Sequence, residues 1–455
     1  MWFAEIKQLR YLILGELLLL GIFGFLGIIP LLSIVAFILV VGVSFFIVEN
    51  PNIGIHILLF SIIVDALFLT RTITSGPSIL IEEVVSVLFF SLFFLKYLFS
   101  LNYDIKFPTF IIVWLPFLIW SWLGLFVAID KFRVIAYWKN YFAGFFTFCL
   151  AYHTITKPQH IKSFLIGIVL WGLSLALIEF KVIAELGGFE IGIVGLFLKK
   201  NLLAIVWGKS NYIAAFFVLI IPIGIGTVIY FKSRLIRILI MIAITVMAFG
   251  LILTLSRGGI LALLVALFIL LSKVLKTKTF IPILVATLLI ATVVALNPLT
   301  TVLIDRMSSV ETSSSYFSRL NYYQDVWNTF LKNPITGVGF GNLGHYSVFK
   351  LSEKDSPSAH NIILGILGET GIVGAIFYFS IFFILWKYLF TLYRNEKNES
   401  LKFLRWCFIS ALIGGFIHAL MEPTFEGFQY SIIYWSIAGS YLKLNLLNVN
   451  KSYNC

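Results

Sequence analysis

The sequence predicts an all-α fold, a polytopic membrane helix bundle of about 12–14 transmembrane helices with one large external loop. Composition is the first reason, since 60% of the 455 residues are hydrophobic, 12% are charged and the mean hydropathy is +1.02. A water-soluble globular protein needs roughly a quarter of charged residues to solvate its surface. The second reason is that apolar runs of about 18–25 residues recur, each long enough to cross a bilayer as a helix. Alternation with a period of two residues is absent, which argues against an outer-membrane barrel.

Each apolar run corresponds to one expected span. In chain order these are residues 11–29, 31–48, 53–70, 80–98, 109–128, 138–152, 163–180, 211–230, 237–255, 258–272, 280–296, 361–386, 406–421 and 428–442. The count falls to about 12 if residues 11–48 or 138–180 are divided differently. The cysteines, Cys149, Cys407 and Cys455, lie in or beside spans or at the terminus. Their spacing is not that of metal ligands, so we expect inert thiols.

The basic residues predict the orientation of the chain. The first apolar run continues past Pro30 without a cleavage site, so no signal peptide is expected and residues 1–10 are interpreted as a cytoplasmic segment. A moderate majority of Lys and Arg then falls in cytoplasmic loops, in line with the positive-inside rule. Both termini are expected in the cytoplasm. The net charge of +12 reflects loops that face anionic membrane lipids, and no nucleic acid partner is expected.

This orientation places four polar features on the external face, although they belong to different spans. They are Arg257, the long polar loop at residues 297–359, His360 and Glu422. Their convergence indicates a site on that face. The alternative is that so many alternating spans bring several polar residues to any one face by chance.

Arg257 lies between two apolar runs, in a segment that reads TLSRGG from residue 254 to 259. An arginine within the membrane costs about 2.5–3.5 kcal/mol on insertion scales, so it is normally paired or functional. Two interpretations stay open. Either the guanidinium extends to lipid headgroups beside the flexible glycine pair, or it faces inward, where its planar donors suit a phosphate or a carboxylate.

The polar loop contains an expected amphipathic helix. Aromatic residues and a leucine recur every three or four positions: Tyr316, Leu320, Tyr323, Trp327 and Phe330. This spacing predicts a helix that lies on the membrane surface. Arg319, near its start, binds either a lipid headgroup or a substrate in this interpretation. Residues 333–342 alternate glycines without a preceding strand, so we interpret them as a tight turn beneath the helix and not as a nucleotide-binding loop.

The polar loop meets an apolar helix at His360 and Asn361. Ser358 can cap that helix, which places His360 in its first turn, where the helix dipole favours the neutral, proton-accepting imidazole. Glu369 follows about 14 Å further along and on the opposite side of the helix, so we expect it to pair with another helix. The glycines around it, at residues 365–374, predict close helix packing.

His418 and Glu422 share one helix face at the end of the penultimate expected span, because they are four residues apart. No third ligand stands at a suitable spacing and the sequence lacks an H-E-x-x-H motif. A structural pair is therefore favoured over a metal site.

Together these residues resemble the O-antigen ligase and polymerase family of integral membrane glycosyltransferases. The matching features are Ser256-Arg257-Gly258, then Ser318-Arg319 followed by Trp327, then Asn333-Pro334-x-x-Gly337-x-Gly339, and His360-Asn361 leading into Glu369-x-Gly371-x-x-Gly374. Asn211, which opens a span, is also similar to the family. The resemblance is clear between residues 200 and 380 and diffuse elsewhere.

The resemblance implies an enzyme of cell-surface polysaccharide biosynthesis in the bacterial inner membrane, with its active site facing the periplasm or exterior. Such an enzyme moves a glycan from a polyprenyl (undecaprenyl) diphosphate carrier to a hydroxyl of a glycolipid or glycan acceptor, with no metal or other cofactor. We expect Arg257 and Arg319 to bind the diphosphate. His360 is expected to act as general base or to position the acceptor. Glu422, Asn361 and Ser256 are expected to support them.

The resemblance also suggests three regions. Residues 1–210 are expected to form N-terminal transmembrane helices, residues 211–386 a catalytic region that includes the loop at 297–359, and residues 387–455 C-terminal transmembrane helices with a cytoplasmic tail.

Two other functions remain open at this stage. A polymerase that joins repeat units on the same carrier would use the same residues, because both reactions break the same bond and differ only in the acceptor. A flippase or transporter would bind its substrate at mid-membrane between inverted repeats. The sequence contains no such repeat, and the acidic residues within its spans form no evident pathway.

Overall fold

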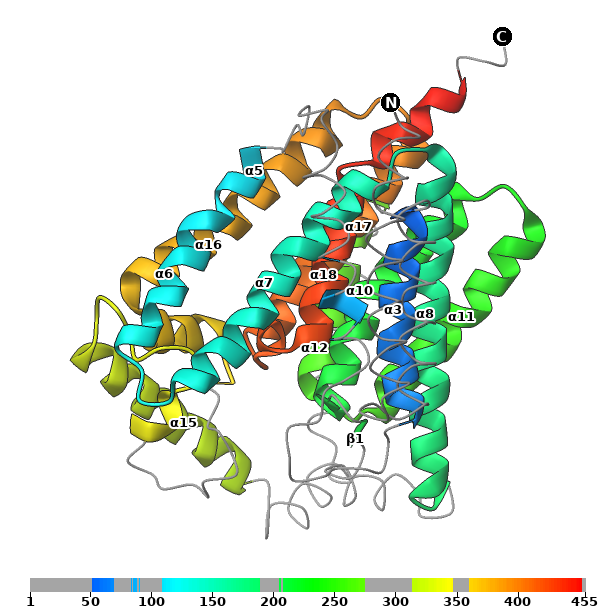
Figure 1. Ribbon diagram of the computed structural model, residues 1–455. Helices are drawn as coiled ribbons and strands as arrows, with labels where there is room; N and C mark the ends of the chain where they lie inside the picture. The colour runs from blue at the N-terminus through cyan, green and yellow to red at the C-terminus, as the bar shows by residue number, and fades with distance from the viewer. Residues whose placement is uncertain are drawn as a thin grey trace, which may run out of the picture.

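The computed structural model is an all-helical bundle with a single two-residue strand pairing in its described part (Figure 1). It describes residues 51–68, 83, 85–87, 90, 109–188, 204–205, 208–274, 313–346 and 360–451. The expected spans 11–29, 31–48 and 280–296 lie outside these residues, and most of 80–98 does too. The total number of spans therefore stays a prediction.

The described helices lie close to the expected spans. They are α3 (Pro51–Phe68), α5 (Thr109–Ile112), α6 (Trp114–Leu123) with η1 (Gly124–Phe126), α7 (Lys131–Thr154), α8 (Pro158–Glu185), α10 (Ser210–Tyr230), α11 (Arg234–Leu253), α12 (Arg257–Val274), α16 (Ile362–Asn395), α17 (Glu399–Ala419) and α18 (Phe428–Tyr441). Among the described residues, α8, α10, α11, α16 and α17 are long and apolar enough to cross a membrane. The protein is a multi-pass membrane protein, as its composition predicted.

Shorter elements connect these helices. They are β1 (Ala204–Ile205), which pairs antiparallel with β2 (Gly208–Lys209), then α15 (Ser313–Lys332), η5 (Leu343–Tyr346), η6 (Thr424–Glu426) and η7 (Leu444–Lys451). The helix expected within the polar loop is thus present as α15.

Local capping signals explain why several helices begin before their apolar runs. The Asp130 carboxylate accepts the Arg133 amide at the start of α7, and the Ser233 hydroxyl accepts the Ile236 amide at the start of α11. Pro158 occupies the first turn of α8, where the missing N–H has no helical partner in any case.

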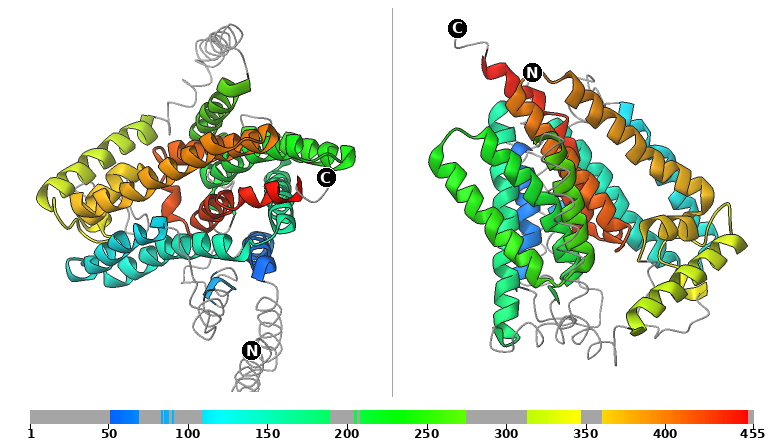
Figure 2. Two further views of the ribbon diagram at one scale, coloured as in Figure 1. Left: turned by 90° about the horizontal axis from the view of Figure 1, so that it is seen from above. Right: turned by 180° about the vertical axis from the view of Figure 1, so that it is seen from behind.

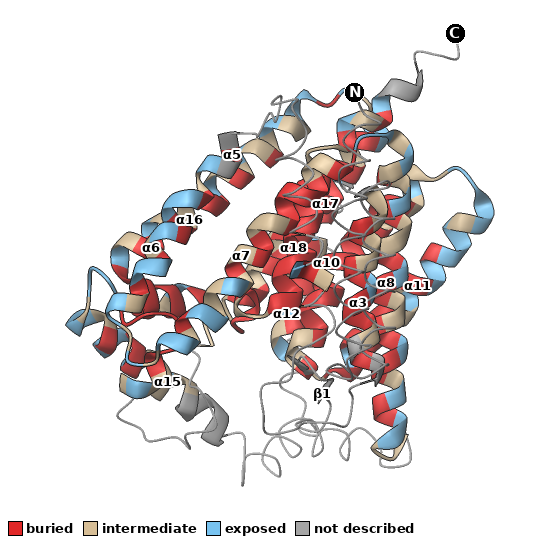
Figure 3. Ribbon diagram, in the orientation of Figure 1, coloured by how far each residue is buried: buried red, intermediate tan, exposed pale blue. Residues whose placement is uncertain are grey.

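The centre of the bundle is formed by α10 and α18. Every residue of α18 is buried, and α10 is buried along most of its length. α10 packs against α17 and α11, and α18 packs against α7. Figure 3 shows buried residues concentrated in these central helices and exposed residues on the outer sides of α6 and α11. Apolar outer faces of this kind suit contact with lipid.

The longest of the described helices, α16, tilts away from the central helices and is accompanied by α6 and α15 (Figures 1 and 2). It is interrupted at Gly371, whose φ of 68° and ψ of −174° are not helical. A left-handed φ is readily adopted only by glycine. The interruption leaves backbone groups of α16 without helical partners.

The turn after α15 fills this break. The Val338 amide donates to the Gly368 carbonyl (3.1 Å), the Gly339 amide to the Glu369 carbonyl (2.8 Å), and the Ile372 amide to the Pro334 carbonyl (2.8 Å). Three glycines in the turn, at 337, 339 and 341, have positive φ. The tight turn predicted for this segment is therefore confirmed, and it is bound to α16 by main-chain hydrogen bonds.

The structure corrects the expected role of Glu369. Its carboxylate accepts the Gly341 amide at 2.9 Å, so it binds the turn and not another helix. Close packing is present at two of the neighbouring glycines, because Gly368 lies against Val326 of α15 and Gly374 lies near Trp120 of α6. Gly371 differs from them, since it interrupts the helix.

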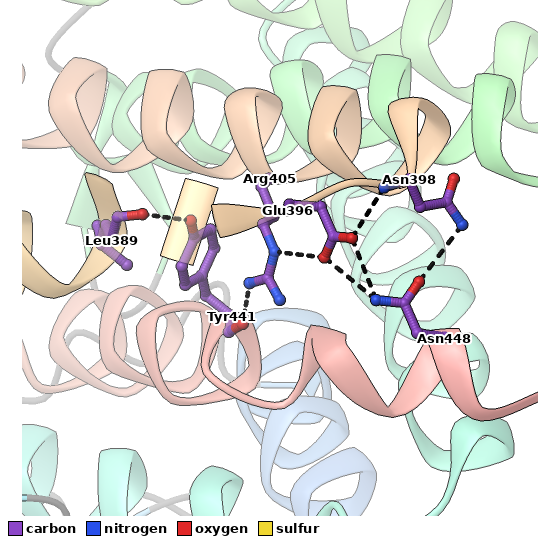
Figure 4. Close-up of polar contacts among 6 residues, drawn as sticks. All are labelled: Leu389, Glu396, Asn398, Arg405, Tyr441 and Asn448. Atoms are coloured by element: carbon purple, nitrogen blue, oxygen red, sulfur yellow. Dashed lines mark hydrogen bonds and ion pairs between the residues drawn. The ribbon is translucent and has the colours of Figure 1, made fainter. Parts of the chain in front are cut away.

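One end of α17 carries a closed ionic network, which we call the Glu396 cluster (Glu396, Arg405, Tyr441 and Asn448; Figure 4). Glu396 lies 3.2 Å from the Arg405 Nε, and both side chains are almost completely buried. The Asn448 amide donates to both oxygens of Glu396. Arg405 also donates to the Tyr441 carbonyl at 3.3 Å. The cluster ties α17 to the end of α18 and to η7.

Candidate functional site

The opposite end of α17 leads to a second carboxylate, Glu422, which lies between α17 and η6 and is 6% exposed. Its Oε1 accepts a hydrogen bond from Arg319 Nη2 (2.7 Å) and another from Asn211 Nδ2 (2.5 Å). Its Oε2 lies 3.0 Å from His360 Nδ1. We call these four residues the Glu422 cluster. Residues from α10, from α15 and from the segment just before α16 therefore meet on one carboxylate.

The loop that carries Glu422 is held from two sides. Tyr212 of α10 donates its hydroxyl to the Pro423 carbonyl at 3.0 Å. Asn140 of α7 donates its side-chain amide to the Glu426 carbonyl at 2.6 Å. These two contacts fix the backbone that carries the Glu422 side chain.

α15 contributes two adjacent side chains to the site. Arg319 and Tyr322 are three residues apart and so lie on one face of the helix. The ring of Tyr322 lies 6.0 Å, centroid to centroid, from the ring of His360. Arg319 and His360 are each about one-third exposed (34%), so both reach the protein surface while Glu422 stays behind them.

The structure corrects the position of His360 relative to its helix. The capping residue of α16 is Asn361, whose Oδ1 accepts the amides of Ile363 (2.9 Å) and Leu364 (3.2 Å). Ser358, the expected cap, lies outside the described residues, and His360 precedes the helix instead of occupying its first turn. Asn361 therefore supports the site by fixing where α16 begins.

His360 has an unusual backbone conformation. Its φ is 44°, and the only other non-glycine residue with positive φ in the described part of the chain is Leu255 (φ 53°), two residues before Arg257. Such conformations cost of order 1–3 kcal/mol and persist where the surroundings enforce them, often at functional sites. The two candidate segments, which precede α12 and α16, thus each contain a non-glycine residue with positive φ.

Arg257 lies at the same end of the bundle. Ser256 is buried and its hydroxyl accepts the Gly259 amide at 3.1 Å, which caps α12. A Cβ placed on Gly258 would lie 3.4 Å from the Met421 sulfur, so the first turn of α12 lies beside the residue that precedes Glu422. The Arg257 side chain is exposed and makes no hydrogen bond or ion pair with the described residues. The structure thus joins Arg319, His360 and Glu422 directly, with Arg257 nearby but not in contact.

The pKa values of the two carboxyl groups of this loop, Glu422 and Glu426, are shifted in opposite directions. Burial alone would raise the pKa of Glu422, but the hydrogen bond from His360 and the charges of His360 and Arg319 outweigh it and hold that pKa below its usual range. For Glu426 burial dominates, and the neighbouring Glu369 and Glu422 add to it, so its pKa lies well above the usual range. Glu422 is thus the carboxyl group of the pair that stays ionised.

The expected pairing of His418 with Glu422 is wrong in its geometry. His418 is fully buried, and neither ring nitrogen has a hydrogen-bond partner within the described ranges. Glu422 instead turns towards Arg319 and His360. These partners are 103 and 62 residues away in sequence and could not be recognised from helix periodicity.

A comparison with protein families now bears on this geometry. Residues 241–379 match the family described as O-antigen ligase. The chain carries an O-antigen ligase family domain. No protein in a search of curated proteins matches the chain.

The O-antigen ligase family domain includes Arg257, Arg319 and His360, and it spans the break in α16. Asn211 and Glu422 lie on either side of it in sequence. The Glu422 cluster is therefore assembled partly from residues beyond the matched segment.

Two members of the surroundings were missed from sequence. Asn211 is assigned from sequence only as a family-like residue at the start of a span, and its contact with Glu422 is not predicted. Tyr322 has the signal of lying one turn after Arg319 within an amphipathic pattern. In the described residues, no group of three or more His, Cys, Asp or Glu side chains has the geometry of a metal site.

Proposed function

We propose that the protein transfers a glycan from a polyprenyl diphosphate carrier to an acceptor hydroxyl at the outer face of the bacterial inner membrane, as an O-antigen ligase does. The observation that carries the proposal is the pair of contacts on Glu422, which hold a guanidinium and an imidazole side by side at a partly exposed position. The O-antigen ligase family domain supports the class of lipid-linked substrate.

The reaction breaks the bond between the anomeric carbon and the diphosphate oxygen and forms a bond from that carbon to the acceptor oxygen. The acceptor loses one proton, and the carrier diphosphate leaves with the electron pair of the broken bond. Two groups are therefore required: a base for the proton and positive charge for the leaving group.

His360 is suited to the proton transfer because of its partner. When Nδ1–H donates to Glu422 Oε2, the neutral imidazole has its lone pair on Nε2, which is the position that accepts a proton. Once protonated, the ring is stabilised by the ionised Glu422 at 3.0 Å. The same contact fixes the plane of the ring, so His360 positions the acceptor as well.

Arg319 and Arg257 are suited to the diphosphate. Arg319 uses one nitrogen for Glu422, and its other N–H groups make no hydrogen bond to the described residues. Planar guanidinium donors match phosphate oxygens and stabilise the charge that develops on the leaving group. Arg257 lies nearby and adds a second positive charge. We propose that the two arginines neutralise the charge on the leaving diphosphate, as a metal ion does in other transferases, so that the reaction is metal-independent.

A polymerase is the second candidate, because it breaks the same bond with the same residues. The two differ in the acceptor, which is a glycolipid core for the ligase and a lipid-linked repeat unit for the polymerase. Parallel assays with the two acceptors separate them.

The test uses purified full-length protein in liposomes with a polyprenyl diphosphate glycan and a chelator. We expect glycan transfer in the wild type and its loss in His360→Ala, Arg319→Ala and Arg257→Ala. Arg234→Ala, an exposed arginine at the opposite end of the bundle, is the matched control and retains transfer. Lipid translocation without transfer contradicts the proposal, as do wild-type rates in His360→Ala and Arg257→Ala.

A further inference from the structure

The surface of α15 is divided into three sectors. At about 100° per residue, the side chains of Asp325, Val326 and Thr329 share one side, and all three are buried. Val326 packs there with Val338 and Leu343 of the following turn. This side attaches α15 to the turn that follows it.

A second sector is apolar but not covered by protein. Leu320, Trp327 and Leu331 fall within about 40° of one another on the helix, and they are 43%, 47% and 57% exposed. Half-buried Tyr323 and Phe330 extend this sector to about 100°. It lies opposite the side that packs against the turn.

The third sector is polar and exposed, and it contains Gln324, Asn328 and Lys332. The presence of a polar sector beside an apolar one is informative. An apolar sector of this width is unfavourable on a helix fully surrounded by water. Exposed polar side chains are unfavourable on a helix within hydrocarbon, so the two sectors together indicate a helix at the interface.

A second exposed apolar segment, the turn between α6 and α7, is attached to the turn that follows α15. The turn between α6 and α7 exposes Phe126 (84%), Ile129 (62%) and Phe132 (85%). It is bound to the turn after α15, because the Asp130 amide donates to Asn342 Oδ1 (2.7 Å) and the Asn342 side chain donates back to the Asp130 carbonyl (3.0 Å). Both segments thus form one attached unit on the flank where α6 and α16 lie (Figure 3).

This unit continues the outer face of a membrane helix. α6 exposes apolar residues at intervals of three or four positions along its length, namely Leu115, Ile119, Trp122 and then Phe126 of η1. Because α6 belongs to an expected membrane span, we expect that row to face lipid. The exposed row extends without a polar interruption from α6 into the turn.

We propose that the apolar sector of α15, together with the α6–α7 turn, lies in the bilayer at the boundary between headgroups and acyl chains. The occupant of this surface is lipid, with Trp327 at the level where indole rings favour the membrane interface. Gln324, Asn328 and Lys332 face the water.

This placement deepens the proposed function and rests on it for its consequence. Arg319 lies beside the apolar sector of α15, so anchoring the helix in the interface holds the guanidinium at headgroup depth. That is the depth at which the diphosphate of a lipid-linked donor is found. The bilayer, together with Glu422, then sets the height of the diphosphate-binding group.

The test measures what surrounds each sector. Leu331→Cys and the matched control Lys332→Cys, about 100° apart on the helix and in different sectors, are labelled with a nitroxide in a Cys455→Ser background; Cys149 and Cys407 are buried. In proteoliposomes we expect the label at 331 to collide preferentially with oxygen dissolved in lipid and the label at 332 with a water-soluble nickel chelate. Nickel access at 331 equal to that at 332 overturns the proposal.

Other occupants give different results. If a protein partner covers the sector, the label at 331 is open to nickel in purified proteoliposomes and loses that access only in native membranes, which also overturns the proposal. The measurement does not need glycan transfer and is repeated in His360→Ala, so its failure is distinguishable from failure of the proposed function.

A second measurement concerns the consequence for the donor. Trp327→Gln with Leu331→Gln is expected to slow transfer from a full-length polyprenyl donor several-fold more than transfer from a short, water-soluble prenyl diphosphate donor. Asn328→Gln leaves both rates unchanged. Equal slowing with the two donors contradicts a role for the bilayer in placing Arg319.

Discussion

The two ends of α17 carry the same pair of chemical groups in different settings. At one end the Glu396 carboxylate and the Arg405 guanidinium are both nearly inaccessible, at 5% and 2% side-chain exposure. At the other end Glu422 is equally hidden at 8%, whereas Arg319 and His360 are each 34% exposed. The two carboxylates are thus similarly buried, whereas their cationic partners differ in exposure.

The difference lies in how the donors are used. Arg405 is also bound to the Tyr441 carbonyl and lies over the Tyr441 ring, and Asn448 occupies the oxygens of Glu396 (Figure 4). Such a closed network has no capacity for a ligand. In the Glu422 cluster the carboxylate orients two cationic side chains whose outer sides face the surface, which is the arrangement that suits binding and chemistry.

The largest expected effect is on transfer activity at the open cluster. Glu422→Gln keeps the size of the side chain but removes the charge that orients His360 and stabilises its protonated form. We expect turnover to lose much of the about 10²–10⁴-fold that a positioned general base contributes. The exposed Glu399→Gln at the other end of α17 is the control and should retain the wild-type rate of glycan transfer in liposomes. Wild-type turnover in Glu422→Gln would remove the distinction between the clusters.

The next effect is on stability. Here the larger loss should occur at the Glu396 cluster and the smaller one at the Glu422 cluster. Arg405→Gln leaves Glu396 buried and unpaired, so we expect a loss of about 3–5 kcal/mol in the free energy of unfolding. Arg319→Gln breaks a partly exposed pair and should cost about 1 kcal/mol or less, while transfer falls strongly. Detergent-solubilised protein is compared by thermal unfolding. Similar losses of stability in the two variants would show that both clusters are structural.

Low pH should reduce the stability that the carboxylates at both ends of α17 contribute. Burial raises the pKa of Glu396, but the Asn398 amide, the Asn448 side chain and Arg405 outweigh it, so its pKa, like that of Glu422, lies below the ordinary value of 4.5. Each folded carboxyl therefore binds fewer protons than its unfolded form, and its stabilisation is fully present above about pH 4.5 and lost as the pH falls through the folded value. The difference in melting temperature between the wild type and Glu422→Gln should shrink as the pH falls below about 4.5, and so should the difference for Glu396→Gln. A difference that does not shrink there contradicts the assignment.

The smallest effects concern the asparagines that donate to each carboxylate. Asn448→Ala should lower stability by about 1 kcal/mol, the net value of a typical hydrogen bond, with transfer unchanged. Asn211→Ala should have a similar cost in stability and also lower the transfer rate, because it loosens the carboxylate that holds His360. Unfolding and transfer are measured on both variants. A lower transfer rate in Asn448→Ala, at unchanged folding, would link the two ends functionally.

Much of this fold could be predicted from composition and hydropathy. Apolar runs gave the positions of α10, α11, α12 and α18 within a few residues, because a membrane leaves a helix as the one local solution for each run. The alternation of spans also brought Arg257, Arg319, His360 and Glu422 to the same end of the bundle. Their catalytic and binding roles stay predictions.

The contacts within the site could not be predicted in the same way. Glu422 was matched to His418 because helix periodicity reports only neighbours on one helix, whereas its partners come from three other segments. His360 was assigned to a first helical turn because Ser358 is as good a cap as Asn361, and only the geometry decides between them. The break at Gly371 was read as part of a packing ridge for a related reason, since a glycine that packs and a glycine that interrupts a helix look alike in sequence.

The break in α16 determines which part of the chain can be exchanged between relatives. The backbone groups beside the break are satisfied by residues 334–339, and Glu369 binds the Gly341 amide in addition. A chimaera that replaces residues 313–346 alone would separate the turn from the helix that it completes. The smallest transferable unit therefore extends from the start of α15 through the first turn beyond Gly371, and swaps intended to change acceptor preference should be cut at those borders.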